Sequence, residues 1–288
     1  MTPQRASTKA KPRRDGIEVL SMDEIKLMRR AGLVVAEALG EMTASAKPGM
    51  TTREIDAIAV EVLARHGATS SFLGYQPGGA PPYPAVSCLS VNEQVVHGIP
   101  GSYVLKDGDL LSIDFGAIVD GYHSDAARSV GIGQLKPEVA ELNTITEQAM
   151  WAGIAAVGPA NTVSDIAVAI QHSILDSGPY GIVCDYSGHG IGHNMHQPPD
   201  VPNRRRPGRS PILVVGMCLA IEPMATLGTE QTQTLNDGWT VSTADGSIGC
   251  HWENTVAITR RGLWVLTEPD GGRAALARLH RRFAPLAD

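Results

Sequence analysis

The chain has 288 residues, of which 43% are hydrophobic and 19% charged, and its formal net charge is −6. This composition excludes a disordered chain and supplies enough apolar side chains for one large domain or two closely joined halves. The negative charge argues against general nucleic-acid binding, and no apolar run approaches the roughly 18 residues of a transmembrane helix. The 4 cysteines lie far apart without a C-x-x-C motif, so neither a zinc ribbon nor a disulfide framework is indicated.

The chain starts with a polar, basic segment, residues 1–21, for which we predict a disordered tail. The alternative is a segment that contacts an acidic partner such as RNA. No apolar stretch follows its basic residues, so it does not have the pattern of a secretory signal. We therefore expect a protein of the reducing cytoplasm.

The first predicted helix runs from about residue 22 to 46. Ser21 and Glu24 form a capping box, and apolar residues then follow at helical spacing. Lys47, Pro48 and Gly49 end the pattern.

An internal similarity follows this helix. Residues 48–67 and 158–178 each read as a turn, a threonine N-cap and an amphipathic helix. Residues 108–114 and 216–222 each read as a turn glycine, a short apolar strand and a final carboxylate. Helix and strand recur in the same order, which favours duplication over chance. Two αβ halves that face each other would place the final carboxylates, Asp114 and Glu222, near a shared centre.

Asp114 and Asp125 are predicted to lie on one face of a β-hairpin. Asp120 and Gly121 form a strong two-residue turn between two strand-like stretches, so residue 116 pairs with Asp125. Asp114 has the same parity as residue 116, which makes the two aspartates diagonal neighbours, roughly 5–8 Å apart. Burial of both carboxylates requires a positive partner, and a metal ion is the natural one.

Three further residues are candidate metal ligands. His189 lies between glycines, Glu222 follows an apolar run, and Glu253 lies in an alternating strand that starts at His251. Each is ambiguous alone, but together with the two aspartates they make four carboxylates and one imidazole. Such an oxygen-rich set carries a charge that matches two divalent ions. Carboxylates can bridge two such ions that lie about 3.5–4 Å apart.

Several motifs occur in a fixed order along the chain: Asn92–Pro100, Asp114 with Asp125, Gly188–Gly192 with His196, Ile221–Pro223, Asp237–Thr240 and Trp252–Thr255. With these motifs the chain resembles the type I methionine aminopeptidases, which are pita-bread metallopeptidases, over about residues 22–265. The resemblance implies an α/β pita-bread fold with two pseudo-symmetric halves around a dinuclear metal site. We place the catalytic domain at 22–268, its halves at about 22–135 and 136–268, and a C-terminal tail at 269–288.

The resemblance also implies a role for each candidate ligand. Asp114 would bind one ion, and Asp125 and Glu253 would bridge the two ions. His189 and Glu222 would bind the other ion. A hydroxide held between the ions would attack the scissile carbonyl, with Glu222 as the general base.

Five further residues match substrate-binding positions of this family. His97 and His196 match the histidines that contact the scissile peptide and assist catalysis. Tyr75, Cys88 and Trp239 match the pocket for the methionine side chain, although core packing is an alternative for these three.

The implied activity is removal of the initiator methionine from nascent polypeptides by a methionyl aminopeptidase, which we expect to be a monomer with no membrane or specific nucleic-acid partner. The two metal ions would be Co²⁺, Mn²⁺, Fe²⁺ or Zn²⁺. One alternative is prolidase or aminopeptidase P activity, although those relatives usually carry an extra N-terminal domain. The other is a non-catalytic binding protein on the same fold.

The sequence departs from the family at three places. Residues 76–83 make a loop that is longer than usual by about five residues, His251 stands where bacterial enzymes usually have glutamine, and Asn254 replaces a frequent histidine. His251 lies two residues before Glu253, so we expect it in the second shell, where it donates a hydrogen bond to a ligating carboxylate or to water. The alternative is that it fills an apolar space.

Overall fold

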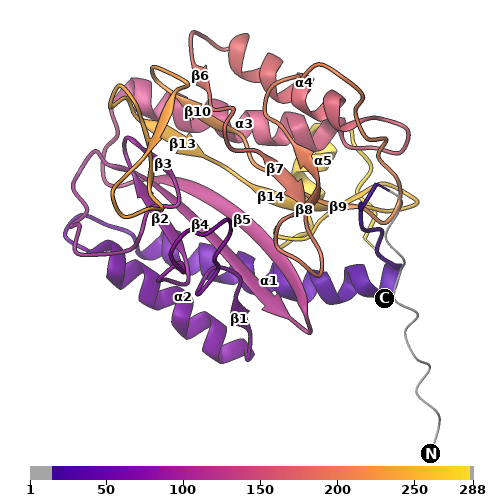
Figure 1. The fold of residues 1–288 in the computed structure, drawn as a ribbon, viewed down its shortest axis with the longest axis horizontal. Helices are drawn as coiled ribbons and strands as arrows, with labels where there is room; N and C mark the ends of the chain where they lie inside the picture. The colour runs from indigo at the N-terminus through magenta and orange to yellow at the C-terminus, as the bar shows by residue number, and fades with distance from the viewer. Residues whose placement is uncertain (1–14, 286–288) are drawn as a thin grey trace, which may run out of the picture.

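The computed structural model describes residues 15–285. Two pairs of helices lie on opposite sides of the strands (Figure 1): α1 (Met22–Ser45) with α2 (Thr52–His66), and α3 (Pro137–Ala156) with α4 (Val163–Leu175). A short helix, α5 (Arg273–Arg278), follows the last strand. No helix among residues 15–285 is long and apolar enough to cross a membrane.

The strands form four sheets. In the first, β4 (Leu110–Val119) pairs with β1 (Thr69–Ser70), β2 (Cys88–Val91) and β5 (Tyr122–Gly131). The largest has the order β15 (Leu263–Val265), β14 (Asn254–Ile258), β9 (Cys218–Ile221), β7 (Gly188–Gly190), β8 (Gln197–Val201). One small sheet has the order β13 (Gly249–His251), β10 (Met224–Thr226), β6 (Gly181–Ile182). The other small sheet has the order β11 (Thr232–Thr234), β12 (Val241–Thr243), β3 (Gln94–Val96).

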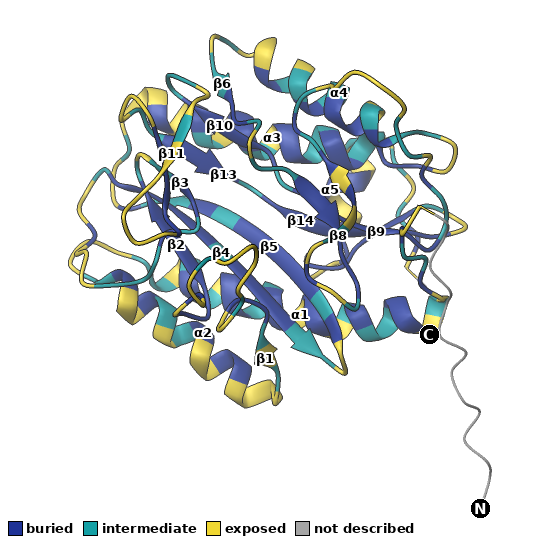
Figure 2. Cartoon of the chain, viewed as in Figure 1, coloured by how far each residue is buried: buried dark blue, intermediate teal, exposed yellow. Residues whose placement is uncertain are grey.

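The helices pack on the strands through clusters of buried apolar side chains. Val35 of α1, Ile55 of α2 and Phe115 of β4 belong to one cluster of buried side chains. Ile166 of α4 and Leu219 of β9 belong to another. The helices are exposed on their outer faces, whereas the central strands are buried (Figure 2). Polar side chains on the strand faces that look toward each other are therefore shielded from water.

The predicted helices are present. The first runs over Met22–Ser45 and starts at the predicted capping box. The N–H groups of Thr51 and Thr162 donate to the carboxylates of Glu54 and Asp165, each at 2.7 Å, so α2 and α4 start in the same way. They end differently: α2 stops at Gly67 in the left-handed conformation, whereas α4 stops at Leu175, three residues before the matching glycine.

The predicted hairpin is confirmed. Asp120 and Gly121 have φ angles of 52° and 84°, as a two-residue turn of this kind requires. Gly116 pairs with Asp125, and Asp114 pairs with Ala127 two positions further on. The side chains of both aspartates therefore project from the same face of the hairpin.

The predicted continuous strand from His251 to Ile258 is wrong. β13 ends at His251 and β14 starts at Asn254. Between them Glu253 pairs with Ala127 of β5, donating and accepting backbone hydrogen bonds of 3.0 and 3.3 Å. This pairing with a strand of the other half interrupts the sheet and ties Glu253 to the aspartate hairpin.

Parts of both predicted tails pack against the domain. Residues 1–14 lie outside the described residues, but Ile17 and Leu20 are buried at 2% and 3% exposure. At the other end, Leu276 of α5 is fully buried and residue 283 pairs with Leu263. Apolar side chains in both segments explain why they pack onto the domain. The division into halves at about residue 135 stays a prediction.

Candidate metal centre

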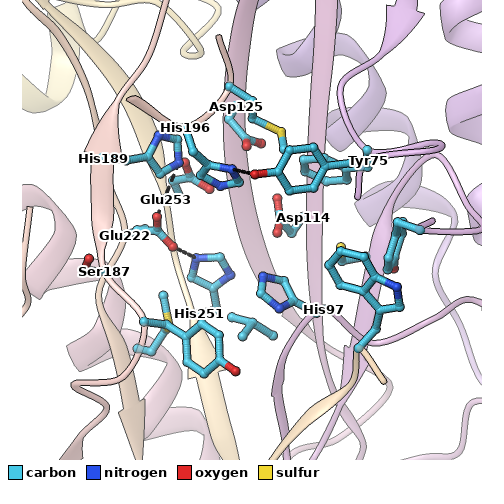
Figure 3. A pocket seen from close by; sticks show the side chains of 18 of the residues that line it. Tyr75, His97, Asp114, Asp125, Ser187, His189, His196, Glu222, His251 and Glu253 are labelled. Carbon is cyan, nitrogen blue, oxygen red and sulfur yellow. Dashed lines mark hydrogen bonds and ion pairs between the residues drawn. The ribbon is translucent and has the colours of Figure 1, made fainter. Parts of the chain in front are cut away.

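One cavity of about 260 Å³ lies between the two halves of the strand layer and gathers every residue predicted for the site. Figure 3 shows the acidic and imidazole groups pointing toward one another across it. The predicted residues among its lining are Tyr75, Cys88, His97, Asp114, Asp125, His189, His196, Glu222, Trp239, His251 and Glu253.

The two aspartates enter from the hairpin, and His189 and Glu222 enter from the opposite sheet. Glu222 directly follows β9, and His189 is the middle residue of β7, which pairs with β9. Ligand atoms of Asp125, His189 and Glu253 lie within 4.8 Å of one another. Side chains that are far apart in sequence thus converge because β5 meets the segment before β14 at Glu253.

His189 is held so that one ring nitrogen faces the cavity. Its Nδ1 donates to the carbonyl oxygen of Gly190 at 3.0 Å, and since a carbonyl only accepts, Nδ1 carries the proton. The lone pair of Nε2 then faces Glu222, whose Oε1 lies 3.6 Å away. This arrangement, with one nitrogen fixed by a backbone carbonyl, is typical of metal-binding histidines.

The donor set fits divalent metal ions. One oxygen each of Asp114, Asp125 and Glu253 is buried without a hydrogen-bond partner among the described residues. Leaving a buried polar atom unpaired costs about 1–3 kcal/mol, and more for a charged group. Metal coordination would satisfy all three, and carboxylate oxygens with one imidazole suit hard or borderline divalent ions.

The electrostatics of the cluster also suit a cation. Burial raises the pKa of Asp125 to about 7, and burial together with neighbouring carboxylates raises the pKa values of Asp114, Glu222 and Glu253 well above their usual range. Burial lowers the pKa of His189 to about 3, so its imidazole is neutral and free to bind a metal. Without a metal, the cluster holds protons at neutral pH that metal binding would displace.

We predict that divalent ions stabilise the fold increasingly as pH rises. In the metal-free protein the folded state binds more protons than the unfolded state between about pH 4 and 7, because Asp125 and its neighbours have raised pKa values. Its stability should therefore fall as pH rises through that window. A metal concentration 100-fold above Kd adds about 2.7 kcal/mol, or roughly 5–10 °C in Tm for a large domain.

The measurement is Tm at pH 5, 6, 7 and 8, with added Mn²⁺ or with a chelator. The gap in Tm between the two samples should widen with pH. An equal gap at all four pH values would contradict the assignment of these carboxylates to a metal centre.

His97 and His196 lie in the cavity beside the ligand candidates. The rings of His189 and His196 are 4.3 Å apart between centroids, and Nδ1 of His196 shares a hydrogen bond of 2.8 Å with the Tyr75 hydroxyl. The His97 ring lies 6.1 Å from that of Trp239. Burial lowers the pKa of His97 to about 4 and also lowers that of His196, so both are neutral at neutral pH. Neutral imidazoles here can donate hydrogen bonds to a substrate.

One end of the cavity has an apolar, aromatic wall. The rings of Tyr75 and Trp239 lie 6.5 Å apart, and Tyr83 meets Trp239 edge-on at 5.1 Å. Cys88 packs in the same buried cluster. Aromatic rings suit a thioether, which makes favourable contacts with ring edges. The wall also includes side chains that the sequence did not single out: Phe72, Tyr83 and Met195.

The long loop over residues 76–83 borders this wall. Pro77 lines the cavity, and the indole N–H of Trp239 donates to the carbonyl oxygen of Pro81 at 2.8 Å. Tyr83 ends the loop and donates its hydroxyl to the carbonyl oxygen of Gly98 at 3.0 Å. The extra residues are thus fixed against Trp239 at the edge of the cavity.

The two other departures have different environments. His251 faces the cavity, with Nε2 3.5 Å from Oε2 of Glu222. Asn254 accepts from Arg128 at 2.8 Å and donates to Glu268 at 3.0 Å, and it is not among the described residues that line the cavity. Arg128 also donates to the backbone oxygen of Glu253 at 2.6 Å. Asn254 therefore belongs to a polar network behind Glu253.

Comparison with known proteins points in the same direction. Residues 26–260 match the model of metallopeptidase family M24. A methionine aminopeptidase of Clostridium perfringens is 48% identical over 85% of this chain and 96% of its own length. Methionine aminopeptidase 1 of Mycobacterium tuberculosis is 47% identical over 86% of this chain and 93% of its own.

The fold agrees with solved structures. A methionine aminopeptidase of Thermotoga maritima superposes with a TM-score of 0.83 at 36% identity, over 88% of this chain and 99% of that one. Prolidase of Pyrococcus furiosus shares the fold, with a TM-score of 0.68 at 22% identity over 87% of this chain and 65% of that one. The predicted resemblance and the predicted pita-bread fold are confirmed.

Proposed function

The chain belongs to metallopeptidase family M24, and from its cavity we propose that it is a methionine aminopeptidase that removes the initiator methionine from nascent polypeptides. The observation that carries the proposal is one cavity that combines a cluster of buried carboxylates and imidazoles with an aromatic wall. The first part suits metal-assisted hydrolysis, and the second suits a methionine side chain. The names of the relatives support the same activity.

The positions of the side chains support a set of ligand roles. Asp114, one oxygen of which is buried without a partner among the described residues, would hold one ion, and His189 with Glu222 would hold the other. Asp125 and Glu253 lie between these two groups and would bridge the ions (Figure 3). When bound, such ions would lower the pKa of the attacking water and polarise the scissile carbonyl. The metals that fit this donor set are Co²⁺, Mn²⁺, Fe²⁺ and Zn²⁺.

The protein side chains would handle protons and orient the substrate. Glu222 lines the cavity beside His189, and its carboxylate would take a proton from the attacking water as general base. His97 and His196, which also point into the cavity (Figure 3), would hydrogen-bond the substrate peptide. The hydrogen bond from Tyr75 would hold the ring of His196 in place.

The expected substrates are nascent polypeptides in the cytoplasm, acted on by a monomer. Prolidase activity is the second candidate, because prolidase has the same fold.

A direct test compares two peptides after metal analysis of the purified protein. With added Mn²⁺ or Co²⁺, the enzyme should release methionine from Met-Ala-Ser and leave an Ala-Pro dipeptide intact. Cleavage of Ala-Pro alone would assign a prolidase. A metal-loaded protein that cleaves neither peptide would indicate a binding protein on this fold.

A further inference from the structure

His251 is a buried imidazole whose ring nitrogens have no hydrogen bond. The residue is 1% exposed, and neither Nδ1 nor Nε2 has a hydrogen-bond partner among residues 15–285. The expected hydrogen bond from His251 to a ligating carboxylate is therefore not formed in this structure. An unpaired buried nitrogen costs about 1–3 kcal/mol, so a group outside the chain is needed to satisfy it.

The ring points at Glu222 across a gap that suits a bridging ion. Nε2 of His251 lies 3.5 Å from Oε2 of Glu222, beyond the usual length of an N–H···O hydrogen bond. Two ligands that each lie about 2.1 Å from one ion are roughly 3.0–3.5 Å apart at octahedral or tetrahedral angles. Nε2 of His189 stands 3.6 Å from Oε1 of the same carboxylate. Each oxygen of Glu222 thus faces a different imidazole (Figure 3).

A third donor completes the arrangement. Ligand atoms of Glu222, His251 and Glu253 all lie within 4.8 Å of one another. One oxygen of Glu253 is buried without a partner among the described residues, like the ring of His251. Arg128 donates a hydrogen bond to the backbone oxygen of Glu253. Two carboxylate oxygens and an imidazole are ligand types that suit a borderline divalent ion.

We propose that Nε2 of His251 is itself a metal ligand, and that with one oxygen each of Glu222 and Glu253 it binds a divalent ion on the side of Glu222 away from His189. The proposal rests on the proposed function only in treating the two glutamates as ligands. An imidazole in place of the usual glutamine shifts the preference of the site toward Zn²⁺ and Co²⁺ and away from Mn²⁺.

The test titrates metal-stripped protein with Zn²⁺ and, separately, with Mn²⁺ by calorimetry. His251→Gln should weaken binding of one Zn²⁺ equivalent by about 10–100-fold, and should weaken Mn²⁺ binding much less. X-ray absorption of the zinc-loaded protein should show fewer nitrogen ligands in the variant than in the wild type. Circular dichroism verifies that the variant is folded, and His251→Asn provides a second amide variant.

His123→Gln is the matched control. His123 is a partly buried imidazole near the site, but its Nδ1 already shares a hydrogen bond of 2.9 Å with Ser71, and it is not among the described residues that line the cavity. This variant should bind both metals like the wild type.

The outcomes separate the two proposals. Unchanged zinc affinity and nitrogen count in folded His251→Gln or His251→Asn would overturn the ligand role. Equal weakening of Zn²⁺ and Mn²⁺ binding with an unchanged nitrogen count would also overturn the ligand role, because that result would show a positioning effect. If the wild type fails to release methionine but keeps His251-dependent zinc binding, the proposed function fails and the ligand role stands.

Discussion

Asp125→Ala is expected to lose metal and to release methionine at least about 1000-fold more slowly than the wild type. Asp125 would bridge both ions, so its removal takes a ligand from each. A metal ion contributes several kcal/mol of charge stabilisation to such a reaction, and a loss of about 4 kcal/mol corresponds to roughly three orders of magnitude in rate. The measurements are kcat/KM on Met-Ala-Ser and metal content by elemental analysis.

The same variant should remain folded. The hydroxyl of Thr255 accepts a hydrogen bond of 3.1 Å from the backbone N–H of Asp125 and donates one of 2.8 Å to its backbone oxygen. Both bonds involve only the backbone of Asp125, so they survive the substitution. Removal of one buried carboxylate from a repulsive cluster should leave the Tm of the metal-free protein equal to or above that of the wild type. Glu61→Ala, an exposed carboxylate on α2, is the control and should retain metal and activity. A metal-replete Asp125→Ala enzyme with near-normal turnover would refute the assignment.

The placement of the two aspartates was predictable because local rules determine it. The Asp120–Gly121 turn fixes the register of the hairpin, and side-chain parity then decides which face each residue takes. The helix starts at Ser21, Thr51 and Thr162 were predictable for the same reason, since a capping box involves residues only three positions apart.

The environment of Glu253 was not predictable from local pattern. Alternation from His251 to Ile258 indicates one strand, but the backbone of Glu253 pairs with Ala127, far away in the chain. Long-range pairing of this kind overrides local periodicity. The expectation that His251 and Glu253 face the same side still agrees with the cavity lining, because both side chains point into it.

The ends of the domain and the aromatic wall show a different limit of prediction from the sequence. Composition suggested tails, but a few apolar side chains such as Leu20 and Leu276 are sufficient to bury a short segment when a complementary surface is present. Likewise, Phe72 and Met195 lie next to predicted positions without a motif of their own, and only the packed cluster brings them to the cavity. These residues are identified only by their tertiary contacts, which a single sequence does not reveal.

The second large effect is expected at His97. Its ring lies 5.4 Å from that of Tyr186 and 6.1 Å from that of Trp239, two aromatic residues that line the cavity. We therefore expect it to bind substrate and not metal. As a neutral imidazole it can donate one hydrogen bond to the oxygen on which negative charge develops, and such a donor is worth about 2.7–4 kcal/mol.

His97→Asn tests this role with little strain, because His97 has a φ of 60°, a conformation that asparagine tolerates better than alanine. The variant should keep its full metal content and lose about 10²–10³-fold in kcat on Met-Ala-Ser. Because burial lowers the pKa of His97 to about 4, the wild-type ring does not titrate between pH 5 and 8. The shape of the kcat profile in that range should therefore be the same for both proteins. Loss of metal would instead make His97 a ligand, and loss of one limb of the profile would make it a proton-transfer group.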